Sequence, residues 1–174
     1  MVRAIAIGCA LATAFLGSAA FAAELDIDRL AGLYTYGFMN GNIEGHKYWS
    51  DDVLEIVKLS PNTAYISIRL EFFNGHQCSL SGVAEAAGPS LVYSDPKIQC
   101  ELHLNVADGK IVFDDKDGHC REQSCGMRGM YTGQKFKLSS RRPITYMPKL
   151  LASFQYLEAI KEYQARHEQS RHEQ

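Results

Sequence analysis

Turn-forming dipeptides recur along most of this chain and restrict it to short elements. They stand about ten residues apart through the middle of the sequence, a spacing typical of all-β sandwiches and barrels. Proline, glycine, asparagine and aspartate favour the backbone angles that tight turns need. The turn signals are Pro61-Asn62, Asn74-Gly75, Gly88-Pro89, Asp108-Gly109 and Asp117-Gly118. We therefore predict a mostly β fold, an antiparallel meander closed as a small barrel or folded as a sandwich.

The segments between these turns carry strand patterns. In residues 65–72, apolar and polar side chains alternate, so Ile66, Ile68 and Leu70 are expected to share the buried face of a strand. Further strands are expected over residues 53–59, 77–86, 91–93, 99–106 and 110–114, with one or two short strands within 126–138.

The end of the chain changes to helical periodicity. Apolar side chains recur at helical spacing at Leu150, Leu151, Phe154, Leu157 and Ile160. We expect a C-terminal α-helix over residues 144–165 with Pro148 near its first turn. The stripe is expected to pack on the barrel, and a partner-binding helix is the alternative. The polar tail, residues 166–174, is expected to fray or be disordered.

The first residues have the composition of a secretory signal peptide. Arg3 precedes a long uncharged run that ends in the small-residue pattern Ala20-Phe21-Ala22. The alternative, a membrane anchor, usually has a stop-transfer charge cluster, and none follows here. We therefore predict that residues 1–22 are removed before Ala23, which leaves a β domain over 23–143, a periplasmic or secreted location and no stable membrane span.

Four cysteines remain after the predicted cleavage, because Cys9 lies within the signal peptide. An even number of cysteines in an exported chain predicts two disulfides. A metal site that includes His119 is the alternative, but the spacing of the last two cysteines differs from that of a tight zinc knuckle. The four residues are Cys78, Cys100, Cys120 and Cys125.

Spacing alone permits three pairings of four cysteines. If residues 77–86 and 91–106 are neighbouring strands around the Gly88-Pro89 turn, Cys78 lies opposite Cys100. Cys120 and Cys125 are close enough along the chain for a local loop. On this basis we predict the pairs Cys78–Cys100 and Cys120–Cys125.

Charge and motifs exclude several classes of function. The formal net charge of -2 lacks the basic excess that nucleic-acid binding needs. The sequence contains no G-x-S-x-G or H-E-x-x-H motif and no glycine-rich phosphate loop, so we expect no enzyme, cofactor or metal. The acidic residues 114–118 lack the length and distal glutamate of an EF-hand. A group of aromatics either fills the core or stacks on sugars: Tyr34, Tyr36, Phe38, Tyr48 and Trp49.

One stretch resembles a family of small exported bacterial β-domain proteins of the lysozyme-inhibitor-like type. It covers residues 75–136, and the resemblance rests on cysteine, glycine and apolar spacing. The matching segments are Cys78-x3-Gly82-Val83-Ala84-Glu85, Cys100-x-Leu102, Ile111-x-Phe113-x-Asp115, Cys120-x4-Cys125-Gly126-x-Arg128-Gly129 and Gly133-x2-Phe136. The resemblance implies a small periplasmic β domain that plugs the active-site cleft of a basic protein, lysozyme.

Two functions follow as hypotheses. The first is a periplasmic binding or inhibitor module that contacts its protein partner through disulfide-braced turns, with Ser79, Ser81, Arg121 and Glu122 as the candidate binding residues. The alternative is an envelope-associated module that binds a small ligand or a glycan in the mouth of a β-barrel, without catalytic activity.

Overall fold

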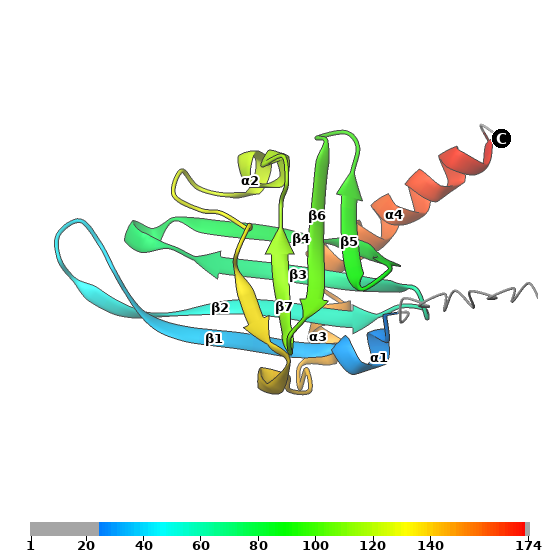
Figure 1. Cartoon of the computed structure of the whole chain (residues 1–174). Coiled ribbons are helices and arrows are strands. Elements are labelled where there is room, and N and C mark those ends of the chain that lie inside the picture. Colours follow the sequence, from blue (N-terminus) through cyan, green and yellow to red (C-terminus); the bar gives the residue numbers. More distant parts are fainter. Residues whose placement is uncertain (1–24, 173–174) are drawn as a thin grey trace, which may run out of the picture.

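The computed structural model describes residues 25–172 and shows one sheet of eight antiparallel strands in sequential order (Figure 1). The predicted signal peptide and its cleavage site lie outside these residues. Each strand pairs with the next, so the predicted meander is confirmed. The strands are β1 (Gly32–Gly41), β2 (Lys47–Lys58), β3 (Thr63–Glu71), β4 (Gln77–Ala87), β5 (Ser90–Asp95), β6 (Cys100–Ala107), β7 (Lys110–Asp114) and β8 (Lys135–Lys137).

The sheet closes almost completely into a barrel, the first of the two predicted architectures. After β8 and the short helix η2 (Leu138–Ser140), the chain returns to the first strand. There Leu33 and Arg142 form an antiparallel bridge, with each amide donating to the other's carbonyl at 2.8 Å. Beyond this bridge β8 crosses β1 at a steep angle, so the two strands separate toward the far end of the β1–β2 hairpin (Figure 1).

Side chains fill the interior of the barrel. Ile66, Ile68 and Leu70 of β3 are all buried, as the alternating pattern predicts. The largest buried side chains around them are aromatic, and Tyr34 also donates its hydroxyl hydrogen to the carbonyl of Leu30 in the short helix α1 (Ile27–Leu30) at 2.7 Å. Since this volume is occupied by packed residues, the barrel holds a core and not an enclosed ligand chamber.

A second apolar cluster lies outside the barrel, where the C-terminal helices α3 (Met147–Leu151) and α4 (Phe154–His172) cover the sheet. Tyr65 of β3 is 2% exposed and meets Tyr156 of α4 edge-on, with ring centroids 4.9 Å apart. Ala159 is buried in the same contact. The predicted C-terminal helix is therefore present and packs on the outer face of the β-sheet.

The face that this helix buries differs from the predicted one. Leu150 is buried, but Leu151, Phe154 and Leu157 are exposed. The predicted stripe assumed one continuous helix, whereas the helix is interrupted between α3 and α4, and this break changes the phase of the residues that follow. The prediction that these three side chains face the core is wrong.

Helix α4 also continues past residue 165 into the tail that was predicted to fray. Arg166 donates to the carbonyl of Ser94 at 2.7 Å, and the imidazole of His167 lies 3.0 Å from the carboxylate of Glu85. These contacts with the sheet explain why the helix persists to His172. No helix within residues 25–172 combines the length and hydrophobicity that crossing a bilayer requires.

The two disulfides join Cys78 to Cys125 and Cys100 to Cys120, so the predicted pairing is wrong. The pairing assumed that β4 lies beside the strand that carries Cys100. Instead, β4 pairs with β5, and the turn at residues 96–99 leads into β6, which places Cys100 opposite Asp95 and away from β4.

The local loop is prevented by helix α2 (His119–Ser124), which begins just before Cys120 and ends just before Cys125. Five residues of helix rotate a side chain by about 140° beyond a full turn, so the two sulfurs point in different directions. Instead, the disulfides tie the two ends of α2 to β6 and β4.

Candidate functional site

The residues predicted to bind a partner fall on two separate parts of the molecule. Ser79 and Ser81 belong to β4, where they pair with Arg69 and Ser67 on the outer wall of the barrel. Cys78 is completely buried, and its disulfide holds α2 on the opposite side of the strand. The two serines therefore do not share a surface with α2.

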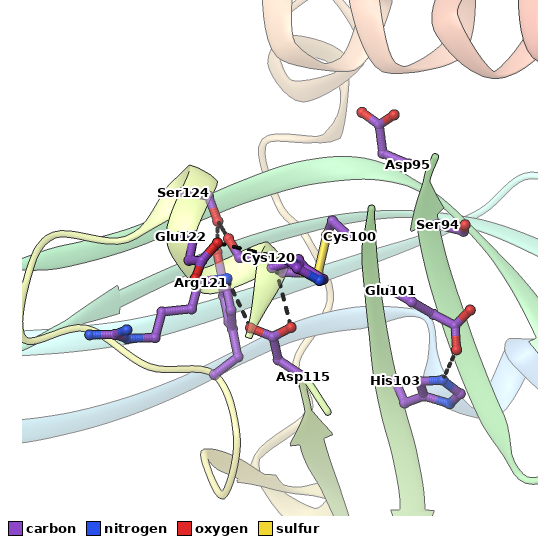
Figure 2. The surroundings of a disulfide bond; sticks show 12 residues. Ser94, Asp95, Cys100, Glu101, His103, Asp115, Cys120, Arg121, Glu122 and Ser124 are labelled. Atoms are coloured by element: carbon purple, nitrogen blue, oxygen red, sulfur yellow. Dashed lines mark hydrogen bonds and ion pairs between the residues drawn. A yellow bond between two sulfur atoms is a disulfide. The ribbon is translucent and has the colours of Figure 1, made fainter. Parts of the chain in front are cut away.

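Arg121 and Glu122 lie on α2, and their surroundings differ. Figure 2 shows the Arg121 side chain pointing away from the Cys100–Cys120 disulfide, while Asp115 lies below the helix. Arg121 donates from Nε to the carbonyl of Gly129 at 2.8 Å and from Nη2 to that of Met127 at 3.0 Å. This guanidinium thus holds the following loop in shape, whereas Glu122 is exposed beside His119.

Asp115 fixes the beginning of α2. Its carboxylate accepts hydrogen bonds from the amides of Cys120 at 3.3 Å and Arg121 at 2.8 Å (Figure 2). A carboxylate in this position satisfies amides that have no partner within the helix. The acidic stretch that contains Asp115 thus has a structural role.

A different surface carries several exposed apolar side chains. It lies where the β1–β2 turn, the β3–β4 turn and the loop after α2 meet, and we call it the distal end. Ile43 is 75% exposed, Trp49 63% and Met127 83%. The members of the distal end are Met39, Ile43, Tyr48, Trp49, Phe73, Met127 and Arg128.

Contacts between the three segments hold the distal end together. The amide of Gly75 donates to the hydroxyl of Tyr48 at 3.1 Å, which joins the β3–β4 turn to β2. The guanidinium of Arg128 lies 5.3 Å from the ring centroid of Phe73, a cation–π contact. The Cys78–Cys125 disulfide ties the start of β4 to the loop that carries Met127 and Arg128.

Buried polar side chains attach the β1–β2 hairpin to the end of β3. Asn40 donates from Nδ2 to the carbonyl of Phe72 at 3.0 Å and to the hydroxyl of Ser50 at 3.2 Å. Asp52 accepts from the amide of Glu71 at 2.7 Å. These bonds act where the ladder between β2 and β3 has ended, at Val53 opposite Arg69, so they keep the projecting half of the hairpin in place.

Trp49 forms a fixed aromatic platform on the outer face of this hairpin. A Cβ atom at Gly37 would lie 2.4 Å from Cζ2 of the indole, so the ring rests directly on the backbone of β1. The indole nitrogen donates to Asp51 at 3.1 Å, which fixes the direction of the ring. Glycine at position 37 is what permits this close approach.

The inner face of the same hairpin borders a cavity of ≈ 530 Å³, which we call the lateral opening. It lies where β1 and β8 separate, and Tyr36, Asp52 and Phe136 contribute to its wall. The pKa of the Asp52 carboxyl is raised to about 6, chiefly by burial; the hydrogen bond from the amide of Glu71 lowers this pKa, and the nearby charges of Glu71 and Asp51 raise it.

A second cavity of ≈ 520 Å³ separates α4 from the outer face of β4, β5 and β6. Its ionisable side chains form local pairs. His103 contacts Glu101 at 2.7 Å, and Glu85 accepts from the hydroxyl of Tyr163 at 3.0 Å and contacts His167. Within residues 25–172, no group of three or more histidine, cysteine, aspartate or glutamate side chains is arranged to hold a metal ion.

The chain matches no family model, no curated protein and no solved structure.

The sequence analysis singled out Tyr48 and Trp49 of the distal end among its aromatic residues, but it did not predict that they lie on an exposed surface. Tyr34, Tyr36 and Phe38 alternate along one strand and share its inner face, and Tyr34 is fully buried in the core. Where β1 leaves the barrel, the same face becomes accessible, and Tyr36 is 57% exposed. The sequence indicates this surface only through a cluster of aromatic residues between positions 34 and 49.

Proposed function

We propose that this protein is an exported, non-catalytic binding module that contacts a protein partner through its distal end. The single observation that carries the proposal is the exposure of aromatic and methionine side chains, with an arginine, on three interlocked turns. Aromatic residues, methionine and arginine are enriched at protein interfaces, and exposed apolar patches of this kind mark interaction sites.

The rigidity of the distal end supports this role. A surface that is already ordered loses little conformational entropy when it binds. The cation–π contact, the Tyr48 hydrogen bond and the Cys78–Cys125 disulfide restrain the three segments before any partner arrives. Two disulfides also suit an oxidising location, the periplasm or the exterior of the cell.

The partner we propose is a basic protein such as lysozyme. The resemblance over residues 75–136 implies this class, and the net charge of -2 would favour the encounter with a basic surface. In this proposal the distal end, rather than Ser79, Ser81 and the α2 residues, makes the decisive contacts.

Lysis assays test both parts of the proposal. Purified, oxidised protein is added to bacterial cell walls with chicken-type, goose-type or invertebrate-type lysozyme, and turbidity is followed. We expect one class to be inhibited, and we expect Trp49→Ala and Phe73→Ala each to weaken inhibition by about 30-fold, the effect of losing one central contact. Ser79→Ala and Glu122→Ala serve as controls and should leave inhibition unchanged.

Two results would contradict these expectations in different ways. Absence of inhibition by micromolar protein in all three assays would reject lysozyme as the partner. Inhibition that persists unchanged in Trp49→Ala and Phe73→Ala would reject the distal end while retaining the function.

A glycan-binding module is the second candidate, and the Trp49 platform is the observation that favours it. A flat, exposed indole with a fixed orientation suits stacking against a sugar ring. Trp49 is the only tryptophan of the chain, so its fluorescence reports binding directly. Saturable quenching or a spectral shift with soluble peptidoglycan fragments would support this candidate, and an unchanged spectrum would exclude stacking on Trp49.

A further inference from the structure

The lateral opening has the size and shape of a small-molecule site. Its volume of ≈ 530 Å³ lies within the range of about 300–1,000 Å³ that is usual for ligand pockets. Phe136 is buried at its wall, and Tyr36 stacks on Phe38 at a centroid distance of 5.9 Å beside it. The ring of Tyr36, which is 57% exposed, provides apolar contact area for the body of a ligand.

One side of the opening carries an acidic group without a cationic partner. Asp52 is only 8% exposed, and its Oδ1 accepts the hydrogen bond from the amide of Glu71. Its other oxygen, Oδ2, accepts no hydrogen bond from any residue in the described range 25–172. Because every fully buried polar side-chain atom in that range has a partner, Oδ2 must border open space, and the space next to Asp52 is this cavity.

The other side carries lysines without acidic partners. Lys110 of β7 and Lys137 of β8 are directly opposite each other in the sheet, and Lys135 is two residues away on the same face. All three contribute to the wall of the opening. None forms an ion pair within 4.0 Å with a carboxylate of the described chain, so this wall is positively charged and uncompensated.

We propose that the lateral opening binds a small zwitterion, an amino acid or a short peptide with free termini. Its ammonium group would pair with Oδ2 of Asp52, its carboxylate would lie among the lysines, and its body would pack against Tyr36. A simple cation would be repelled by the lysines and a simple anion by Asp52, whereas a molecule with both charges satisfies both walls. This site is separate from the exposed contacts of the distal end and does not depend on them.

Titration calorimetry with matched ligands tests this inference. The probes are L-phenylalanine, dialanine and trialanine, each also in an N-acetylated and a C-amidated form. We expect at least one free form to bind to the oxidised protein and each of its blocked forms to bind at least tenfold more weakly. Asp52→Asn and the double variant Lys135→Gln/Lys137→Gln should each weaken binding at least tenfold.

Two controls separate loss of the site from loss of the fold. Glu122→Gln changes an exposed carboxylate on α2, and Lys97→Gln removes a lysine from the turn between β5 and β6, so neither should alter binding. Urea unfolding verifies that each variant is folded. Absence of binding by all three free probes at 10 mM would overturn the inference, as would blocked forms that bind as tightly as free ones.

Discussion

Replacement of Asp52 by asparagine is expected to stabilise the protein at neutral pH and not in acid. In the native structure the carboxylate is almost completely removed from water and has no cationic partner among the described residues. Asparagine has nearly the same shape, and its side-chain oxygen can still accept the hydrogen bond from the amide of Glu71. The change therefore removes a buried charge and retains the hydrogen bond.

The size of the effect follows from the pKa of Asp52. Its rise from 3.8 to about 6 on folding corresponds to about 3 kcal/mol of destabilisation when the group is ionised in both states. Because Oδ2 borders the water-accessible lateral opening, part of this penalty is screened. We therefore expect Asp52→Asn to raise the free energy of unfolding by about 2 kcal/mol at pH 7.

The sign of the pH dependence is fixed by linkage. Between pH 3.8 and 6 the native state holds a proton on Asp52 that the unfolded state has released, so the contribution of this group to stability falls as pH rises. Below pH 3.8 the carboxyl is neutral in both states and the two proteins should be equally stable. The gain in stability of Asp52→Asn over the parent protein should thus appear between pH 4 and pH 6 and reach its full value above pH 6.

Urea unfolding with intact disulfides, followed by Trp49 fluorescence and far-UV circular dichroism at several pH values, measures this difference. Glu122→Gln is the control, since Glu122 is an exposed carboxylate on α2 and its change should alter stability at pH 7 by less than about 0.5 kcal/mol. Equal stability of Asp52→Asn and the parent protein at pH 7 would refute the reasoning.

Three further outcomes follow from the sequence and the fold. N-terminal sequencing of the exported protein should begin at Ala23 or within two residues of it, and an intact Met1 would reject the predicted processing. Non-reducing peptide mapping should recover Cys78 linked to Cys125, and replacing both by serine should lower the free energy of unfolding by about 4 kcal/mol in the chain-entropy model for their separation of 47 residues. Gly82→Ala should destabilise by about 1–3 kcal/mol in the same urea assay, because its Cβ would lie 2.1 Å from the ring of Tyr93.

The parts of the fold that the sequence predicts are those with local causes. Asn74-Gly75, Gly88-Pro89 and Asp108-Gly109 all lie at turns between paired strands, and Asn74 and Asp108 adopt positive φ angles of 62° and 50°. These turns together fix the order of the neighbouring strands. Strand alternation then identifies the buried side of β3, as its inner residues show.

The first hairpin was not predicted. The Asn-Gly dipeptide near it, Asn40-Gly41, lies within β1, and the turn that follows is closed by a side chain. The side-chain oxygen of Asn42 accepts from the amides of Glu44 at 3.1 Å and His46 at 2.9 Å, which turns the chain between β1 and β2. Gly45 has a φ of 84° there. Without this turn the predicted strand began at residue 53, although β2 begins at Lys47.

The disulfide pairing and the candidate site depend on three-dimensional relations that spacing does not contain. The cysteine pairs join α2 to β4 and β6, and this helix was not predicted. Likewise, the separation of β1 from β8 decides which inner-face residues are buried and which line the lateral opening. Tyr34 and Tyr36 have equivalent sequence positions in an alternating pattern and opposite environments.

The β1–β2 hairpin can serve two different contacts because its side chains alternate between faces. Met39 and Trp49 are directly opposite each other and point outward at the distal end, while Tyr36 and Asp52, also opposite each other, point inward to the lateral opening. A change on one face leaves the other side chains in register, provided that the backbone is retained. Trp49→Ala should therefore affect the proposed partner contact and not zwitterion binding, and Asp52→Asn should do the reverse. A variant that impaired both would indicate that the two faces are coupled through the position of the hairpin itself.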